Sequence, residues 1–293
     1  MESIVGYRLS PRQRHLWALL QDGGPGEARA LLRLRGALDP AALASALEAL
    51  VARHEVLRTS FERLPGMPEA LQVVEDRGVA LEAGEELAAL PAEARQARLE
   101  AAWAGGEGSP LPAGRLLRTG EAEHLLLLRV HALGADEASF EHLARDLAAL
   151  YAAERGGGAV EDEPVPYLAV SEWLNEVASA EEAQAGRAHW ARQCEGEEAP
   201  LAVERDDEPA AGSAAARRAL PAALAASLEA FAERAGIPAD AVLLAGWMAL
   251  LHRMGRAGSV RVGVAFDGRA DDELRHAVGP FTEHLPVAAP VDA

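Results

Sequence analysis

Residues 124–151 read HLLLLRVHALGADEASFEHLARDLAALY, and this stretch decides the class of fold. Its four consecutive leucines predict a strand at His124–His131 that is covered on both faces, as the central strands of layered proteins are. The apolar residues after the strand recur at helical spacing and predict a helix with one buried side; they are Phe140, Leu143, Leu147, Leu150 and Tyr151. A buried strand that runs into an amphipathic helix predicts an α/β layered fold.

Helices and strands alternate through the rest of the chain as well. Ser10 is expected to cap a helix in which Pro11 takes the first position and Gln13 completes a capping box. A second helix is expected to begin at Asp39-Pro40. Further elements are predicted from periodicity: helices at Ala92–Ala104, Pro221–Ala235, Ala239–Met254 and Asp271–Ala277, strands at Arg29–Arg35, Val56–Phe61, Ala70–Val74 and Val260–Phe266, and an extended end at Phe281–Val287.

The composition excludes several classes of protein. Of the 293 residues, 49% are hydrophobic, so a disordered chain is not expected. The net charge of -18 repels phosphate backbones and anionic lipids, so neither nucleic acid nor a membrane is expected as a partner. The single cysteine, Cys194, cannot form an internal disulfide. With no secretory signal and no apolar run near the roughly 20 residues that span a bilayer, we expect a cytoplasmic protein.

Several segments, in order along the chain, resemble the motifs of the condensation domains of nonribosomal peptide synthetases. Arg53–Phe61 (RHEVLRTSF) is similar to the second motif of that family almost letter for letter. Leu9–Trp17 (LSPRQRHLW) resembles the first motif, and Val278–Val287 (VGPFTEHLPV) resembles the fifth. Tyr167 and Trp173 stand where the fourth motif has its aromatic residues. The order of these segments favours a condensation-type domain over the whole chain.

The resemblance implies an α/β fold of two lobes, like that of chloramphenicol acetyltransferase. Residues 1–178 are then expected to form the N-terminal acyltransferase-like lobe, residues 179–215 a connecting helix and linker, and residues 216–293 the C-terminal lobe. This second lobe is expected to be partial, because the family's domains continue past the fifth motif. The stretch Glu195–Ala215, rich in Glu, Asp, Ala and Pro and without a period, fits the linker.

The resemblance also implies substrates and partners. Acyl or aminoacyl groups would arrive as thioesters on the phosphopantetheine arms of carrier protein domains, in adjacent synthetase modules, and the domain itself would bind no cofactor. The substrate tunnel would be lined by Trp17, Gly279, Phe281 and Glu283. Glu283 and His284 stand where the fifth motif has Asn and Thr, so the substrate contacts at that strand are expected to differ from those of the family.

The family's third motif, H-H-x-x-x-D-G, falls on the loop after the leucine-rich strand. In the register that fits the following helix, His131 takes the first His position and Ala132 the second. Asp136 then matches the Asp, and Glu137 replaces the Gly. A second register, with His131 as the second His, places Ala135 at the Asp and needs one inserted residue. By resemblance the second His orients or deprotonates the attacking amine, and alanine can do neither.

Three residues are left as candidates for the chemistry: His131, Asp136 and Glu137. By resemblance, Asp136 forms a structural salt bridge with an arginine of the second motif, either Arg58 or Arg53; otherwise these are ordinary surface charges. Glu137 is either a substitute base or a solvated carboxylate at a helix start. His131 is either catalytic or a buried core residue. The spacing of carboxylates and histidines near the loop is not that of a metal site, and no metal is expected.

Two functions follow from this sequence. The first is an enzyme that joins a carrier-bound acyl or aminoacyl thioester to an amine or alcohol and so forms an amide or an ester. The second is a catalytically inactive, condensation-like platform that docks carrier proteins or recruits a tailoring enzyme, which Ala132 favours. A third possibility is a decayed fragment without an independent role.

Overall fold

The computed structural model describes residues 5–23, 26–105, 111–160, 162–195, 218–255 and 259–290. The chain divides into two compact units. The first consists of Met1–Ala183 and Phe266–Glu283, and the second of Gln184–Ala265 and His284–Ala293. The sequence-based boundaries assign everything after residue 216 to one C-terminal lobe, whereas residues 266–283 pack with the first unit.

The first unit contains most of the helices and strands. In chain order they are β1 (Tyr7–Arg8), α1 (Pro11–Gln21), β2 (Glu27–Arg35), α2 (Pro40–Arg53), η1 (Glu55–Arg58), β3 (Thr59–Glu62), β4 (Leu71–Val74), β5 (Ala80–Glu86), α3 (Ala92–Ala104), β6 (Ala113–Gly120), β7 (Glu123–His131), α4 (Glu137–Glu154), α5 (Tyr167–Ser179) and η2 (Asp272–Leu274). This alternation confirms the predicted α/β class.

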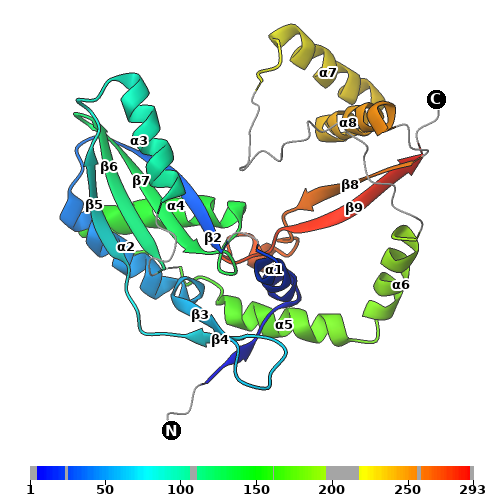
Figure 1. Cartoon of the computed structure of the whole chain (residues 1–293), viewed down its shortest axis with the longest axis horizontal. Helices are drawn as coiled ribbons and strands as arrows, with labels where there is room; N and C mark the ends of the chain where they lie inside the picture. Colours follow the sequence, from blue (N-terminus) through cyan, green and yellow to red (C-terminus); the bar gives the residue numbers. More distant parts are fainter. Residues whose placement is uncertain are drawn as a thin grey trace. The chain divides into compact units, whose positions relative to one another are not determined.

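A four-stranded sheet in the order β2-β7-β6-β5 forms the framework of the first unit. The leucine-rich strand β7 pairs antiparallel with β2 on one edge and with β6 on the other, so it is central, as predicted. Alternate residues of a strand point to opposite faces. Leu126 and Leu128 belong to the main core cluster together with α2 and α4, whereas Leu125 belongs to a smaller cluster with α3. Figure 1 shows α2 and α4 on one side of this sheet and α3 on the other.

The predicted helix caps are present. The Ser10 hydroxyl accepts a hydrogen bond from Gln13 N at 3.1 Å, and Gln13 Oε1 accepts one from Ser10 N at 2.9 Å, which completes the capping box of α1. Asp39 Oδ1 accepts hydrogen bonds from the first backbone amides of α2. These bonds satisfy amides that have no partner inside the helix.

The predicted strand at Val56–Phe61 begins later than expected. Glu55–Arg58 form the short 3-10 helix η1, in which Leu57 N donates to His54 O at 3.0 Å. Only Thr59–Glu62 pair with β4, in a small sheet of the order β1-β4-β3. Val56 and Leu57 are both buried, and a short apolar run does not distinguish a buried turn from a buried strand.

Two strands of the main sheet lie where the sequence pattern indicates none. β5 and β6 read ALEAGEE and AGRLLRTG, in which glycine and charged residues interrupt the alternation expected of a strand. β5 is an edge strand, where charged side chains are tolerated and discourage pairing with another chain. The tertiary structure, rather than local propensity, makes these segments extended.

The second unit contains three helices and a two-stranded sheet of β8 and β9 among its described residues. Its elements are α6 (Ala183–Gln193), α7 (Ala222–Ala235), α8 (Ala239–Gly255), β8 (Ser259–Phe266) and β9 (Glu283–Pro290). The predicted helices and the predicted strand of this part are confirmed within two residues. Residues 196–215 of the predicted linker lie outside the described residues. No single described helix has the length and apolarity to cross a membrane, although α7 and α8 together pass that test as a pair bent by 106°.

Candidate active site

The loop between β7 and α4 carries the residues that the sequence assigns to the chemistry. It opens with a tight turn in which Gly134 N donates to His131 O at 2.8 Å. Ala132 N donates to Gly26 O at 3.0 Å, and the carbonyl of the fully buried Leu133 accepts a hydrogen bond from Gln13 Nε2 at 3.0 Å. None of these contacts involves the Ala132 side chain, so the shape of the turn does not depend on that methyl group.

Gln13 connects this loop with the small sheet. Its Nε2 also donates to Gln72 Oε1 at 2.8 Å, and both side chains are 0% exposed. Gln72 Nε2 in turn donates to the hydroxyl of Ser171 on α5 at 3.1 Å. Buried amides need such partners, because an unpaired one costs about 1–3 kcal/mol. The glutamine of the first motif therefore positions the loop from inside the core.

His131 is a largely buried, neutral imidazole. Its ring lies 4.5 Å from the Phe61 ring, and its Nδ1 accepts a hydrogen bond from Leu133 N at 3.1 Å. Burial lowers the pKa of His131 to about 4, although the nearby Glu27 carboxylate opposes this shift. A base with so low a pKa accepts a proton poorly at neutral pH. The geometry therefore favours the interpretation of His131 as a buried core residue over its interpretation as a catalytic residue.

Glu137 is the first residue of α4, and its side chain is exposed to solvent. A carboxylate at this place interacts favourably with the amides at the start of the helix. The position agrees with the solvated-carboxylate alternative, while its role as a substitute base stays a prediction.

Asp136 is the N-cap of α4 and the centre of a dense network of hydrogen bonds. Its Oδ1 accepts from Ser139 N at 2.9 Å and from the Ser139 hydroxyl at 2.6 Å. Its Oδ2 accepts from the backbone amides of Phe281 and Thr282, each at 2.9 Å, and from the Thr282 hydroxyl at 3.0 Å. The carboxylate thus ties the start of α4 to the segment that leads into β9, and this role is structural.

The arginine that pairs with Asp136 is Arg269. Its Nη1 and Nη2 donate to Oδ2 and Oδ1 at 3.0 and 2.8 Å, and its side chain is only 1% exposed. Burial alone would raise the pKa of Asp136, but the hydrogen bonds from Arg269 and Ser139 outweigh burial and lower it to about 2. The guanidinium also lies 4.4 Å from the centre of the Phe281 ring, a cation–π contact.

The expected Asp136–Arg58 salt bridge is not found among the described residues and is replaced by this pair. Arg58 ends η1 instead of lying on a strand, and its Nη1 donates to Glu75 O at 3.0 Å. The alternative, Arg53, contacts Asp146 of α4 at 3.3 Å. Both arginines of the second motif are thus engaged with partners other than Asp136.

Sequence reasoning missed Arg269, although a signal for it exists. Arg269 follows the turn Asp267-Gly268, and Gly268 has a φ of +74°. A β-carbon on Gly268 would lie 2.3 Å from Phe281 O, so only glycine fits there. An arginine directly after an obligatory glycine, just before the fifth motif, is the feature that points to an inward guanidinium.

The second motif connects several helices of the first unit, and its last residue, Phe61, contacts His131 of the loop. His54 is 4% exposed, and its Nε2 lies 2.8 Å from Asp146 Oδ2. The hydrogen bond with His54 is the main reason why the pKa of Asp146 is lowered. Glu55 Oε1 accepts a hydrogen bond from Leu168 N, near the start of α5, at 3.2 Å. The close match to the family in this motif therefore reflects contacts that stabilise the fold.

The residues predicted to line a substrate tunnel divide into two groups. Gly279 and Phe281 are buried in the first unit, where Phe281 makes an edge contact with Tyr167 at 5.3 Å between ring centres. A β-carbon on Gly279 would lie 2.0 Å from the Tyr167 ring. Trp17 is half-buried on α1, and Glu283 is exposed at the start of β9. Substrate contact by Trp17 and Glu283 stays a prediction.

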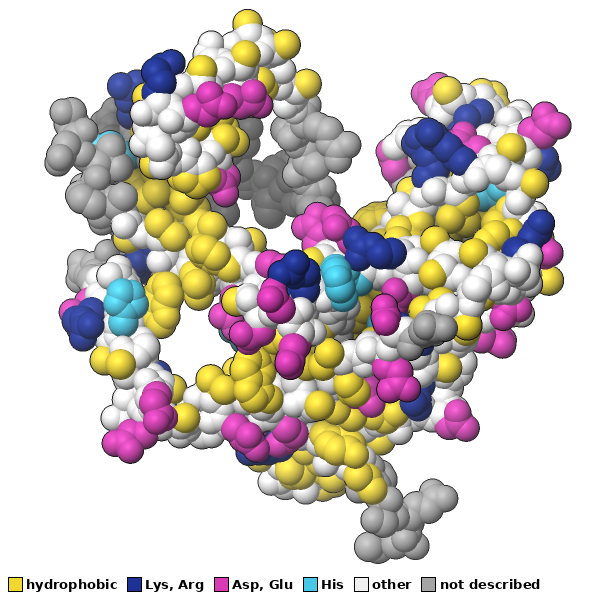
Figure 2. Space-filling model, turned by 180° about the vertical axis from the view of Figure 1, so that it is seen from behind, with side chains coloured by type: hydrophobic (Ala, Val, Ile, Leu, Met, Phe, Trp, Pro, Cys, Tyr) yellow, Lys and Arg dark blue, Asp and Glu magenta, His cyan; other side chains and the backbone are white. Residues whose placement is uncertain are grey.

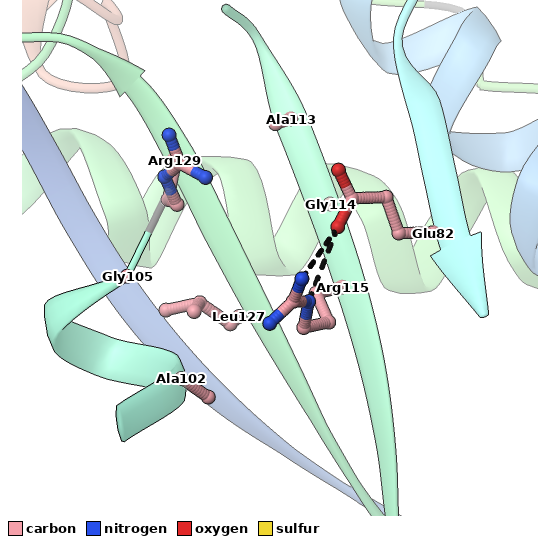
Figure 3. Close-up of a pocket in the computed structure, with 8 residues that line it drawn as sticks. All are labelled: Glu82, Ala102, Gly105, Ala113, Gly114, Arg115, Leu127 and Arg129. Atoms are coloured by element: carbon pink, nitrogen blue, oxygen red, sulfur yellow. Dashed lines mark hydrogen bonds and ion pairs between the residues drawn. The ribbon is translucent and has the colours of Figure 1, made fainter. Parts of the chain in front are cut away.

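A small cavity on the α3 side of the main sheet is not a substrate site. Figure 3 shows the residues that line it, among them Glu82 and Arg115, which form an ion pair at 3.0 Å. Arg129 on the same face binds Glu27 through two hydrogen bonds of 2.9 Å. The cavity has a volume of about 10 Å³, which holds about one water molecule. The described residues also contain no group of three or more potential metal ligands.

Comparison with known proteins agrees with the motifs. A family model described as "Condensation domain" matches residues 5–293. The chain is 33% identical over 298 residues to CymA of Salinispora arenicola, described as a probable non-canonical nonribosomal peptide synthetase, with 96% of this chain and 4% of that protein covered. It is 32% identical over 295 residues to an isonitrile lipopeptide synthase of Mycobacterium tuberculosis, with 94% of this chain and 12% of that protein covered. The chain thus spans a small part of the length of these relatives.

A solved structure gives the same picture of the fold. The first condensation domain of the calcium-dependent antibiotic synthetase matches with a TM-score of 0.82 at 23% identity, over 98% of this chain and 70% of that one. At this identity the likeness concerns the fold alone. It confirms the predicted architecture of the chloramphenicol-acetyltransferase type.

Proposed function

Because this chain belongs to the condensation domain family of nonribosomal peptide synthetases, we propose that it joins a carrier-bound acyl or aminoacyl thioester to an amine. The amine nitrogen attacks the thioester carbonyl, a C–N bond forms and the C–S bond breaks. The phosphopantetheine thiol of the donor carrier leaves, and the proton lost by the amine passes through solvent to that thiol. The partners are carrier protein domains, and the domain itself binds no cofactor in this scheme.

The shape of the loop at residues 131–136 is the observation that supports this proposal. The turn and the Asp136–Arg269 pair are complete although Ala132 replaces the imidazole. His131 does not compensate, since its Nδ1 is engaged and its pKa is about 4. Holding two reactants together supplies effective molarities of about 10⁵–10⁸ M. We therefore propose catalysis by positioning, at a rate about 10²–10⁴ below that of a domain with a general base.

The test incubates the chain with donor and acceptor carrier proteins, each loaded with its thioester, and follows the condensed product by intact mass. We expect the condensed product to form faster in the presence of the chain than from the two loaded carriers alone. Glu137→Gln should leave that rate unchanged, because the Glu137 side chain is exposed at the start of α4. Glu141→Gln, which removes a carboxylate one turn further along the same helix, is the matched control.

Two outcomes would contradict catalysis by positioning. Loss of product in Glu137→Gln but not in Glu141→Gln would make Glu137 the base. Absence of product from the wild-type chain, together with measurable binding of a loaded carrier, would favour the inactive platform, for which Ala132 is the supporting observation.

A further inference from the structure

A groove between α5 and η2 in the first unit has no role in the proposed chemistry. It has a volume of about 590 Å³. Its lining combines the buried core residues Val170 and Leu274 with the half-buried Val165. None of the residues of the loop at 131–137 lines it. A concave surface of this size accommodates several side chains of a ligand.

Ala169 and Trp173 of α5 line one wall of the groove, and Val177 continues their apolar stripe beyond this lining. Ala169, Trp173 and Val177 follow one another at intervals of four residues and so share one face of the helix. Trp173 and Val177 are 43% and 48% exposed. Exposed tryptophan beside other apolar residues is typical of a surface that binds another protein, because its burial contributes a large share of interface affinity.

The opposite wall carries three consecutive carboxylates, Asp271, Asp272 and Glu273. Asp272 forms an ion pair with Arg275. In the part of the chain that the structure describes, no ion pair involves Asp271 or Glu273. Figure 2 shows acidic side chains and apolar patches next to one another on the face it presents. An indole face together with free carboxylates is the chemistry that recognises a lysine or arginine side chain.

The size and charge of the groove decide what kind of ligand fits. A single ammonium ion would leave most of the 590 Å³ and the apolar stripe in water. An acidic or phosphate-bearing ligand would meet the carboxylates and a chain of net charge -18. We propose that this groove docks an amphipathic basic peptide segment of a partner protein, with its apolar side chains on Trp173 and Val177 and a lysine or arginine between Trp173 and the carboxylates.

The test uses the full chain and a short synthetic helical peptide with arginines along one face and leucines along the other. Calorimetric titration is expected to show binding that weakens as salt is added, because exposed charges are screened. A peptide with glutamates in place of the arginines should not bind. Trp173→Ala and the double variant Asp271→Asn/Glu273→Gln should each weaken binding about tenfold or more, which corresponds to losing one strong contact.

The control is the double variant Glu181→Gln/Glu182→Gln, which removes the same charge from exposed residues just beyond α5 and should change affinity less than about twofold, as non-contacting exposed charges do. An equal loss in this control would mean general charge attraction and would overturn the proposal. So would absence of binding, or equal binding of a peptide with serines in place of the arginines. All these substitutions are at exposed side chains, so the variants are expected to fold, which circular dichroism checks. The result does not depend on whether the chain condenses thioesters.

Discussion

Asp136 and Arg269 are 133 positions apart in the chain, yet they meet through two parallel hydrogen bonds of 3.0 and 2.8 Å. Their side chains are 9% and 1% exposed. Bidentate pairs of this kind are among the strongest hydrogen-bonded contacts in proteins. This pair joins the start of α4 to the segment before β9, so it holds together the two parts of the sequence that form the first unit.

Arg269→Ala should lower the free energy of unfolding by about 3–5 kcal/mol, because it leaves the buried Asp136 carboxylate without its cation. Urea unfolding followed by circular dichroism measures this change. The control is Arg275→Ala, which breaks the exposed pair with Asp272 and should cost less than about 1 kcal/mol. Equal effects of the two substitutions would show that the buried pair does not hold the unit together.

The stabilising effect of Asp136 should disappear in acid. The pKa of Asp136 falls from an ordinary 3.8 to about 2 on folding, so its charged form favours the folded state. This contribution is complete above about pH 4 and is lost as the pH falls towards 2, and it amounts to roughly 2 kcal/mol. The difference in unfolding free energy between the wild type and Asp136→Asn should therefore shrink over that interval. A difference that stays constant would contradict the assigned network.

His131 should titrate far below the usual range of histidine. Burial lowers its pKa from 6.5 to about 4, so its ring resonances in an NMR pH titration should have a midpoint near 4. Because the neutral form is the one favoured by folding, His131 contributes stability above pH 6.5 that is lost as the pH falls to about 4. His131→Leu identifies the resonances. A midpoint near 6.5 would mean that the ring lies in solvent.

Ala132→His should raise the rate of condensation by about 10²-fold or more, since it supplies the imidazole that the loop lacks. The hydrogen bonds described for the turn are made by backbone groups and Gln13, so the melting temperature should change little. Product formation in the loaded-carrier assay measures the effect. Ala138→His, at the second position of α4, is the control. An unchanged rate in a folded Ala132→His variant would show that residue 132 does not face the reacting groups.

Gly279→Ala should destabilise the first unit by more than about 2 kcal/mol, because the new β-carbon would lie 2.0 Å from the buried Tyr167 ring. Gly246→Ala is the matched control on α8, where a β-carbon meets nothing within 4 Å. That substitution should stabilise its helix by about 0.5–1 kcal/mol, as alanine does in place of glycine. In thermal unfolding, the melting temperature should therefore fall for Gly279→Ala and rise for Gly246→Ala.

Local patterns were sufficient to predict the central strand, the helix caps and the helices of the second unit. The leucines of β7 and the Ser10–Gln13 box depend on neighbours within a few residues, and such signals are readable from sequence. The partner of Asp136 was predicted wrongly, because a contact across 133 positions leaves no periodic trace. β5 and β6 were missed for a related reason, since their extended form depends on pairing with the rest of the sheet.

The turn at residues 131–134 is held by backbone groups and by Gln13, without help from the side chain of residue 132. We therefore expect reactivity and architecture to be separable at this position, so that an imidazole could be gained or lost there with the surroundings unchanged. A reactive and a silent version of the domain would present one and the same outline to a neighbouring module. A partner that binds only to that surface would dock on both versions. The two versions would then differ only in whether the thioester is consumed.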